Sequence, residues 1–197
     1  MANTFDLASI RKDFPILDQS VNGAPLVYFD NAATTQKPQL VMDALQHYYT
    51  KDNANIHRGL HTLAERATTG YELTRKKLAE FLHAPSSDQI IFTSGTTAGI
   101  NLVAQTFGRA NFKTGDVILV SNLEHHSNIV PWQMIAQEMG ASIEVIPVDE
   151  TGVLDLDAFV NQLDSQVKLV AVNHVSNAIG TINPIAKIIS LAHAKGA

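Results

Sequence analysis

Apolar runs that predict strands alternate with segments of helical periodicity in the second half of the chain. In chain order, these runs and segments are 116–121, 129–139, 142–148, 155–163, 168–173 and 184–195. Pro131 in the first turn of one helix and Gly140 after its last residue mark the limits of that helix. Alternating strands and helices are typical of a parallel sheet covered by helices on both faces. The pattern therefore predicts an α/β protein.

The first half of the chain predicts separate elements without this regular alternation. They are a short helix over 6–14, a turn at Asn22-Gly23, a strand from Pro25, and helices over 38–51 and 62–83. A polar stretch between the two long helices contains His57 and His61, whose spacing on a helix would suit a metal ion. Gly59 weakens such a helix and no Glu follows His57, so no metal site is predicted.

A turn of glycine and threonine lies between an apolar run and a helical pattern at residues 89–101. The run Ile90 to Phe92 predicts a strand, and Gly95, Thr96 and Thr97 follow it. The first turn of a helix has unpaired N–H groups and a positive partial charge, so this turn is suited to a phosphate. On the pattern alone, an N-cap role for Thr96 or Thr97 is the commoner explanation.

Polar loops follow three of the predicted strands. They are 94–97, 122–128 and 174–180. Ligands of open parallel sheets bind beyond the carboxyl ends of the strands. Three polar loops at one edge favour a ligand that carries a phosphate and an aromatic or heteroatom-rich ring. A dinucleotide-binding domain fits the alternation of elements, but no Gly-x-Gly-x-x-Gly follows any strand.

The composition and charge of the chain argue against several classes of function. The 197 residues carry a net charge of −5 without a basic cluster, which argues against nucleic-acid binding. No apolar run is long enough for a membrane span, and the N-terminus lacks the features of a signal peptide, so we expect a cytoplasmic protein with no membrane partner. The absence of cysteine excludes disulfides, thiolate metal sites and cysteine nucleophiles within these residues.

Five motifs, taken together and in order, resemble the group II cysteine desulfurases, which are pyridoxal-phosphate-dependent enzymes of the class V aminotransferase family. The motifs lie at 28–33, 57–61, 95–97, 124–132 and 174–180. The resemblance implies part of the large domain of the PLP-dependent fold type I, a mainly parallel sheet with helices on both faces, incomplete at the C-terminus. It further implies a lead-in and small-domain contribution over 1–30 and the truncated PLP-binding domain over 31–197.

The resemblance also implies roles for individual residues. Gly95, Thr96 and Thr97 would bind the cofactor phosphate. His125 would lie flat on the pyridine ring and act as the catalytic group that moves a proton, since imidazole titrates near neutral pH. Asn177 would bind the phenolic oxygen of the cofactor and orient the substrate carboxylate. The implied substrate-binding residues are Ala32, Ala33, His57 and Asn177. Without the family, each histidine is more often a structural polar residue.

Two departures qualify the resemblance. Ala98 stands where this branch usually has an acid, which puts in doubt a contact at the subunit interface or site entrance. The sequence stops at Ala197, before the segments that in the family carry the aspartate for the pyridine nitrogen, the cofactor-binding lysine, the substrate-binding arginine and the sulfur-accepting cysteine. The resemblance thus implies the N-terminal portion of an enzyme that turns L-cysteine into alanine plus enzyme-bound sulfur for iron–sulfur cluster or other sulfur assembly, and that this portion alone is inactive.

Partners and alternatives follow from the same resemblance. The complete enzyme is expected to be a homodimer that delivers sulfur to an acceptor protein. A selenocysteine lyase, or another class V β-lyase or aminotransferase, is an open alternative, as is a non-catalytic homologue that serves as a binding or dimerisation module. We expect the 197 residues expressed alone to be insoluble or molten. In the resembled fold the strand at 89–93 loses its neighbour when the missing half is removed, and the strand at 168–173 becomes an open apolar edge. A sharp cooperative melt would contradict this expectation.

Overall fold

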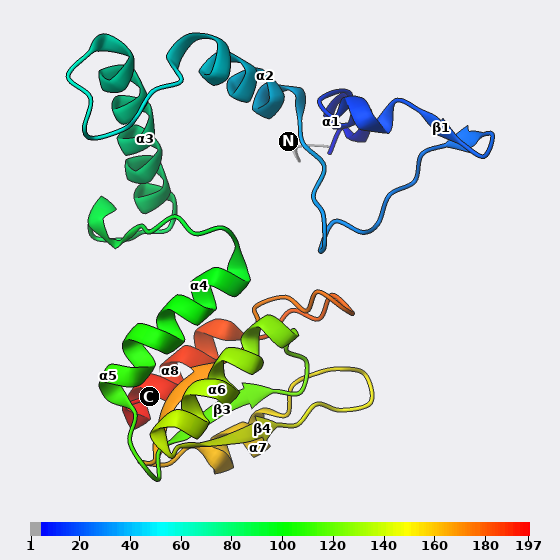
Figure 1. Cartoon of the computed structure of the whole chain (residues 1–197). Coiled ribbons are helices and arrows are strands. Elements are labelled where there is room, and N and C mark those ends of the chain that lie inside the picture. The colour runs from blue at the N-terminus through cyan, green and yellow to red at the C-terminus, as the bar shows by residue number, and fades with distance from the viewer. Residues whose placement is uncertain (1–4) are drawn as a thin grey trace. The chain divides into compact units, whose positions relative to one another are not determined.

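The computed structural model describes residues 5–197 in two compact units, which are divided between Ile91 and Phe92 (Figure 1). The expected domain limits at residues 30 and 31 refer to the complete enzyme and stay a prediction. The first four residues of the expected segment 1–30 lie outside the described part of the chain.

The first unit consists of short helices, a small hairpin and one long helix. Its elements are α1 (Leu7–Lys12), η1 (Pro15–Leu17), β1 (Ser20–Val21), β2 (Ala24–Pro25), α2 (Gln39–His47), η2 (Tyr48–Asp52), α3 (Thr62–Phe81) and η3 (Ser87–Gln89). Asn22 and Gly23 both have positive φ, 53° and 78°, as a type I′ hairpin turn between β1 and β2 requires. The predicted turn is confirmed.

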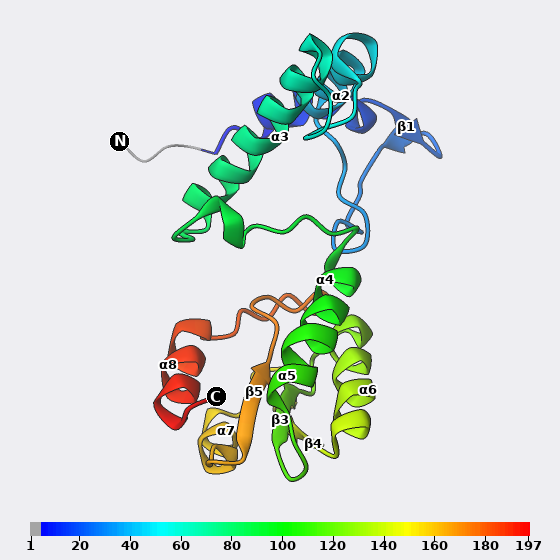
Figure 2. The same cartoon turned by 60° about the vertical axis from the view of Figure 1, so that its left-hand side comes forward.

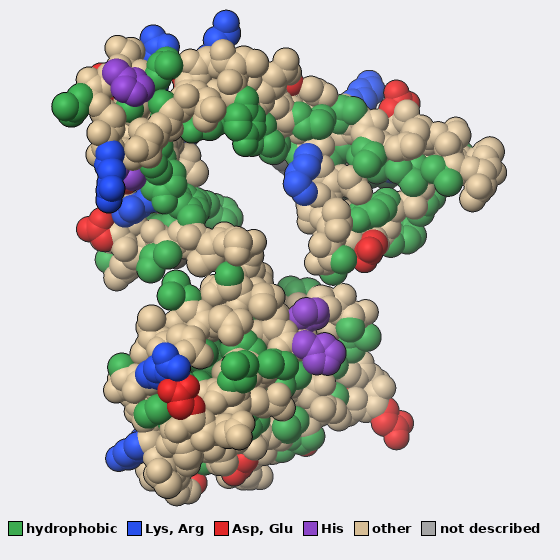
Figure 3. All heavy atoms as spheres, viewed as in Figure 1, with side chains coloured by type: hydrophobic (Ala, Val, Ile, Leu, Met, Phe, Trp, Pro, Cys, Tyr) green, Lys and Arg blue, Asp and Glu red, His purple; other side chains and the backbone are tan. Residues whose placement is uncertain are grey.

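The strand predicted from Pro25 is wrong beyond that residue. Residues 26–30 pair with no strand in the described part of the chain, and Phe29 is 91% exposed. The two long helices are confirmed, although η2 continues α2 as a single π-helical turn. Apolar side chains of α2, such as Leu40 and Leu45, remain exposed, and Figure 3 shows hydrophobic side chains on the surface of this segment.

The second unit is an α/β layer structure. Its elements are α4 (Thr96–Val103), η4 (Ala104–Gly108), α5 (Arg109–Asn111), β3 (Val117–Ser121), η5 (His126–Asn128), α6 (Val130–Met139), β4 (Ser142–Ile146), α7 (Leu156–Gln162), β5 (Val167–Ala171) and α8 (Ile185–Lys195). Within the described residues the sheet has three parallel strands in the order β4-β3-β5. The predicted α/β alternation is confirmed.

The central strand β3 carries apolar side chains on both of its faces. Ile118 and Val120 belong to one buried cluster, with Trp132 of α6 and Ala104 of η4. Val117 and Leu119 belong to the opposite cluster, whose other members come from β4, β5, α7, α8 and the loops beside them. Figure 2 shows the sheet between α7 and α8 on one side and α4 to α6 on the other. Alternation of side chains along a strand explains why both faces need covering.

Local signals define the helix ends in this unit. Asp155 caps α7, because its carboxylate accepts the N–H groups of Asp157 and Ala158. Gly140 and Gly196 end α6 and α8 in the left-handed conformation that glycine adopts readily. These ends agree with the sequence prediction to within one or two residues. None of the helices in residues 5–197 has both the length and the apolar character needed to cross a bilayer.

The run Ile90 to Phe92 does not form the predicted strand. Residues 90–92 have no strand assignment, and Ile91 is 70% exposed. A strand needs a neighbour for its N–H and C=O groups, and an apolar run cannot supply one by itself. As expected, β5 lies at an edge of the sheet. The behaviour of the isolated chain stays a prediction.

Candidate functional site

The start of α4 depends on the backbone of Gly95. This residue is the N-cap of the helix with φ 149° and ψ 178°, a conformation that is open almost only to glycine. A Cβ added there would meet no atom within 4 Å, so the requirement comes from the backbone itself. Thr96 and Thr97 are the first helical residues and make no capping bond. The N-cap explanation for the two threonines is therefore wrong, and their hydroxyls are not used to cap this helix.

An open cavity of about 300 Å³ lies beside the first turns of α4. Thr97 and Asn101 line it from α4, and the segment before α6 supplies the remaining lining residues, which are His125, His126, Ser127, Val130 and Pro131. We refer to this cavity as the α4 pocket. The structure thus brings Thr97 and His125, which are 28 positions apart in the sequence, to one surface. No lysine or arginine lines the α4 pocket, and the start of α4 contributes the positive partial charge of a helix N-terminus.

The His125 ring is held on one side by Ser127. His125 is the N-cap of η5, and its Nδ1 accepts the backbone N–H of Ser127 at 3.1 Å. The Oγ of Ser127 lies 2.9 Å from the same Nδ1. The His126 ring lies edge-on to His125, with ring centroids 6.0 Å apart. His125 is exposed, so its ring is oriented by hydrogen bonds and not by burial.

Glu124 ties the His125 loop to neighbouring elements. Its Oε1 accepts the Ser121 hydroxyl at 2.6 Å and the backbone N–H of Asn173 at 2.8 Å. Its Oε2 accepts the Asn128 side-chain amide at 2.8 Å, and Asn128 in turn accepts the indole N–H of Trp132 at 2.9 Å. Sequence reasoning assigned no role to Glu124. The sequence signal that could have indicated this role is an acid shortly after a buried strand, together with amide side chains at the ends of two strands that could donate to it.

A second set of bonds connects the loops that follow β3 and β5. The Asn173 side-chain amide donates to the Leu123 carbonyl at 2.9 Å, and that of Asn183 donates to the Asn173 carbonyl at 2.8 Å. Asn177 lies in the loop closed by the bridge between Val175 and Ile182 and is exposed. It does not line the α4 pocket. Its predicted place beside the cofactor therefore stays a prediction.

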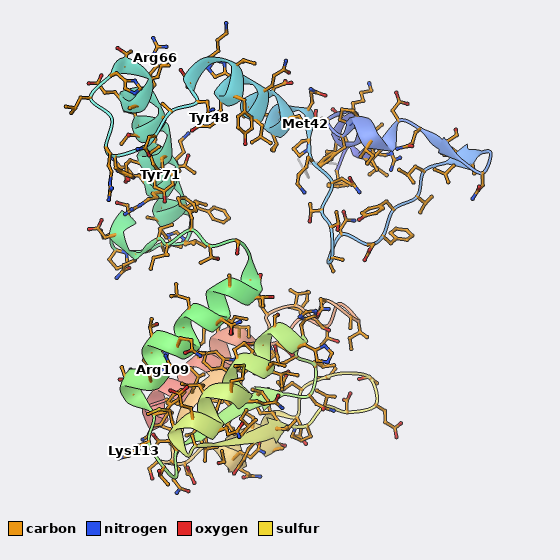
Figure 4. The ribbon with its side chains drawn as sticks, in the orientation of Figure 1. Met42, Tyr48, Arg66, Tyr71, Arg109 and Lys113 are labelled. Atoms are coloured by element: carbon orange, nitrogen blue, oxygen red, sulfur yellow. The ribbon has the colours of Figure 1, made fainter. Side chains whose placement is uncertain are left out.

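The other predicted substrate residues lie in the first unit. His57 has a positive φ of 65°, and its backbone N–H donates to the Thr68 hydroxyl at 2.9 Å. Its Nε2 lies 3.4 Å from a carboxylate oxygen of Glu72, and its ring packs edge-on against Tyr71 (Figure 4). Ala32 and Ala33 are exposed in a turn. Within residues 5–197, no three His, Cys, Asp or Glu side chains converge as a metal site would require.

The clearest shifts in pKa lie away from the α4 pocket. A hydrogen bond from Arg109 on α5 lowers the pKa of Glu138 on α6; the closest N···O distance is 2.7 Å (Figure 4). The pKa of Asp149 is also lowered, chiefly because the Thr151 hydroxyl donates to its carboxylate. Both groups are surface features of the second unit.

Parallel strands, polar loops beyond their carboxyl ends and a glycine turn at a helix start are features of α/β domains that bind ligands beyond the carboxyl ends of their strands. The model of the family described as aminotransferase class-V matches residues 27–197, and the chain belongs to this family. A probable cysteine desulfurase from Mycolicibacterium paratuberculosis is 55% identical over 98% of this chain and 28% of its own length. The family and the fold expected from the sequence are confirmed.

Two solved structures show the same fold along the chain. The apo structure of a cysteine desulfurase from Thermococcus onnurineus superposes with a TM-score of 0.90 at 40% identity, over 100% of this chain and 47% of that one. A cysteine desulfurase from Escherichia coli has a TM-score of 0.84 at 38% identity, and the match covers 98% of this chain and 47% of that one. The 197 residues thus span less than half the length of these relatives.

Proposed function

We propose that residues 1–197 are the N-terminal portion of a PLP-dependent cysteine desulfurase, which converts L-cysteine to alanine and keeps the sulfur on an enzyme thiolate. Family membership and similarity to desulfurases along the whole chain support this proposal. The observation that carries it is the α4 pocket, where the start of α4 and the His125 ring line one cavity. The thiolate itself is not among these residues, because they contain no cysteine.

The start of α4 is suited to the cofactor phosphate. Its first N–H groups have no partner within the helix, and the helix dipole adds positive potential. Gly95 allows this turn to form, and Thr97 lines the pocket with a hydroxyl that is not used as a cap. We assign Gly95, Thr96 and Thr97 to the phosphate, since unpaired N–H groups at a helix start are a recurrent anion site.

The ring of the cofactor is assigned to His125, which lines the α4 pocket and provides an aromatic face and ring nitrogens that can take up or release a proton. The bound cofactor would supply the electron sink that stabilises negative charge on the substrate. His125 would carry the proton that the reaction must move. Asn177 would donate to the phenolic oxygen and orient the substrate carboxylate. The proposed substrate pocket also contains Ala32, Ala33 and His57.

Cofactor uptake by the full-length gene product is the decisive test. Titration with pyridoxal 5′-phosphate should produce a visible absorption band of bound cofactor, and added L-cysteine should yield alanine and, with a reductant, sulfide. Thr97→Ala should weaken cofactor binding about tenfold or more, because a hydrogen bond to a charged group contributes about 1.5 to 3 kcal/mol. Failure of a folded full-length protein to bind the cofactor would remove the proposal.

A matched variant controls for loss of a helical threonine. Thr106 donates its hydroxyl to the Leu102 carbonyl one turn earlier and does not line the α4 pocket. Thr106→Ala should leave cofactor affinity unchanged. Selenocysteine assayed beside cysteine separates a selenocysteine lyase from a desulfurase. A protein that takes up cofactor but acts on neither amino acid would favour another class V reaction.

We further propose that the complete enzyme is a homodimer and that its sulfur passes to an acceptor protein for iron–sulfur cluster or other sulfur assembly. The exposed apolar side chains of α2, Leu40 and Leu45 among them, are consistent with contacts to further protein surface. Sedimentation of the full-length product with and without a candidate acceptor would measure both associations.

A further inference from the structure

Ser127 offers the Nδ1 atom of His125 two groups of different hydrogen-bonding character. The backbone N–H of Ser127, 3.1 Å away, can only donate a hydrogen bond. The hydroxyl Oγ, 2.9 Å away, can either donate or accept. Both belong to the residue that η5 places two positions after His125. Among residues 5–197, the Nε2 of His125 has no hydrogen bond or ion pair.

These two groups favour different tautomers of the neutral ring. A Nδ1 without a proton accepts the N–H of Ser127, and the ring then carries its proton on Nε2. A Nδ1 with a proton needs an acceptor, and the Ser127 hydroxyl is the one beside it. Only this second tautomer leaves a lone pair on Nε2. The N–H alone would hold the ring in the form that cannot accept a proton at Nε2.

We propose that Ser127 is a positioning residue whose hydroxyl provides the tautomer of His125 that takes up a proton at Nε2. In this tautomer Nδ1–H donates to Oγ of Ser127 and no longer accepts the Ser127 N–H, and Nε2 accepts a proton from the bound ligand to give the imidazolium. The same nitrogen later returns that proton, and the Nδ1–H to Oγ hydrogen bond is kept throughout. The inference rests on the proposed role of His125 as a proton carrier. It identifies Nε2 as the nitrogen that takes up the proton, because the Ser127 hydroxyl accepts a hydrogen bond from Nδ1–H.

The tautomer is measured directly by long-range ¹H–¹⁵N correlation on the full-length gene product labelled at histidine nitrogen, without cofactor. The sample is kept at alkaline pH, where the spectrum itself distinguishes the two neutral tautomers from the imidazolium. His125→Asn identifies the resonances by their loss. We expect the wild-type ring to populate both tautomers. Ser127→Ala should lower the ratio of the Nδ1–H to the Nε2–H form about fivefold to tenfold, the effect of losing one net hydrogen bond.

Two further variants make the test specific. Ser127→Thr keeps a hydroxyl and should restore the wild-type ratio. Ser86 is a serine at another 3-10 helix, η3, where its Oγ accepts the Asp88 N–H at 3.1 Å. Ser86→Ala should leave the His125 ratio unchanged. Should Ser127→Ala fail to fold, Ser127→Cys takes its place, because sulfur is a weak acceptor in a side chain of similar shape. An unchanged ratio in a folded Ser127→Ala or Ser127→Cys protein, or no recovery in Ser127→Thr, overturns the inference.

Cofactor uptake and turnover are read on the same samples, so the two proposals fail separately. Normal cofactor binding with an unchanged tautomer ratio refutes only the role of Ser127. Absence of cofactor binding refutes the proposed function whatever the ratio. If both proposals hold, Ser127→Ala should reduce kcat in proportion to the lost population of the reactive tautomer, by at most about fivefold to tenfold, and should change KM less than kcat.

Discussion

The two units of the chain bury very different amounts of apolar surface. The second unit has two hydrophobic clusters on opposite faces of one sheet. The described part of the first unit has only three buried residues, Ala64, Ala67 and Ala79. Burial of apolar surface is the main stabilising contribution to a fold, so the second unit has a core of its own and the first does not. The first unit is expected to depend on additional protein surface for its stability.

The same difference applies to the residues proposed for the cofactor and for the substrate, which lie in different units. Thr97 and His125 lie on segments anchored to the core of the second unit, and the Glu124 network ties their surroundings to β5. Ala32, Ala33 and His57 lie on segments of the first unit that have no comparable support. Cofactor residues can therefore be preformed within this chain, whereas the substrate residues should become ordered only when their surroundings are complete.

Removing one aromatic ring from each unit should give the largest contrast. Phe159 of α7 is fully buried, and Phe29 is 91% exposed. Phe159→Ala should lower the free energy of unfolding of the full-length gene product by about 3 to 5 kcal/mol, through lost burial and a cavity. Phe29→Ala should change it by less than about 0.5 kcal/mol. Urea unfolding measures both values, and hydrogen exchange at β3 assigns the loss to the second unit. Equal effects would refute the comparison.

Substituting one glutamate in each unit compares how strongly the polar networks of the two units stabilise the fold. Glu124 receives three hydrogen bonds from uncharged donors in a partly buried site, and Glu124→Gln turns an NH₂ group toward one of them. This should cost about 1 to 3 kcal/mol of stability. Glu72 is 41% exposed and pairs with His57 and Arg75, so Glu72→Gln should cost about 0 to 1 kcal/mol. The same urea titration ranks the losses of stability in the two variants. A larger loss in Glu72→Gln than in Glu124→Gln would show that the exposed ion pairs form the stronger network.

The smallest expected effect concerns the pair Arg109–Glu138. The pKa of Glu138 is lowered in the folded state, so its contribution to stability is present above the ordinary glutamate pKa, roughly 4.3, and is lost as pH falls through the lowered value. Arg109→Ala should return the pKa of Glu138 toward its ordinary value in a carboxyl NMR titration. Arg66 forms an ion pair with Asp52 in the first unit, and Arg66→Ala should leave the Glu138 titration unchanged. An unmoved Glu138 pKa in Arg109→Ala would contradict the assigned cause.

Sequence reasoning succeeded where structure follows from neighbours along the chain. The β3, β4 and β5 strands and their helices were predicted because apolar periodicity, Asp155 and Gly140 act locally. It failed at residues 26–30 and at Ile90 to Phe92, since a strand exists only beside another strand. The N-cap at Gly95 was missed in favour of the threonines, because composition does not reveal which residue adopts the unusual φ.

The amino-acid sequence by itself determined the α/β alternation, the family and the turn of glycine and threonine at the start of α4, because periodicity, caps and motifs are properties of the chain as written. Only the tertiary structure decided that Thr97 and His125 share one cavity and that Glu124 reaches Asn173, 49 positions further along the chain. Contacts between distant residues arise when a sheet orders its strands and packs helices on them, and no local pattern specifies which side chains then meet.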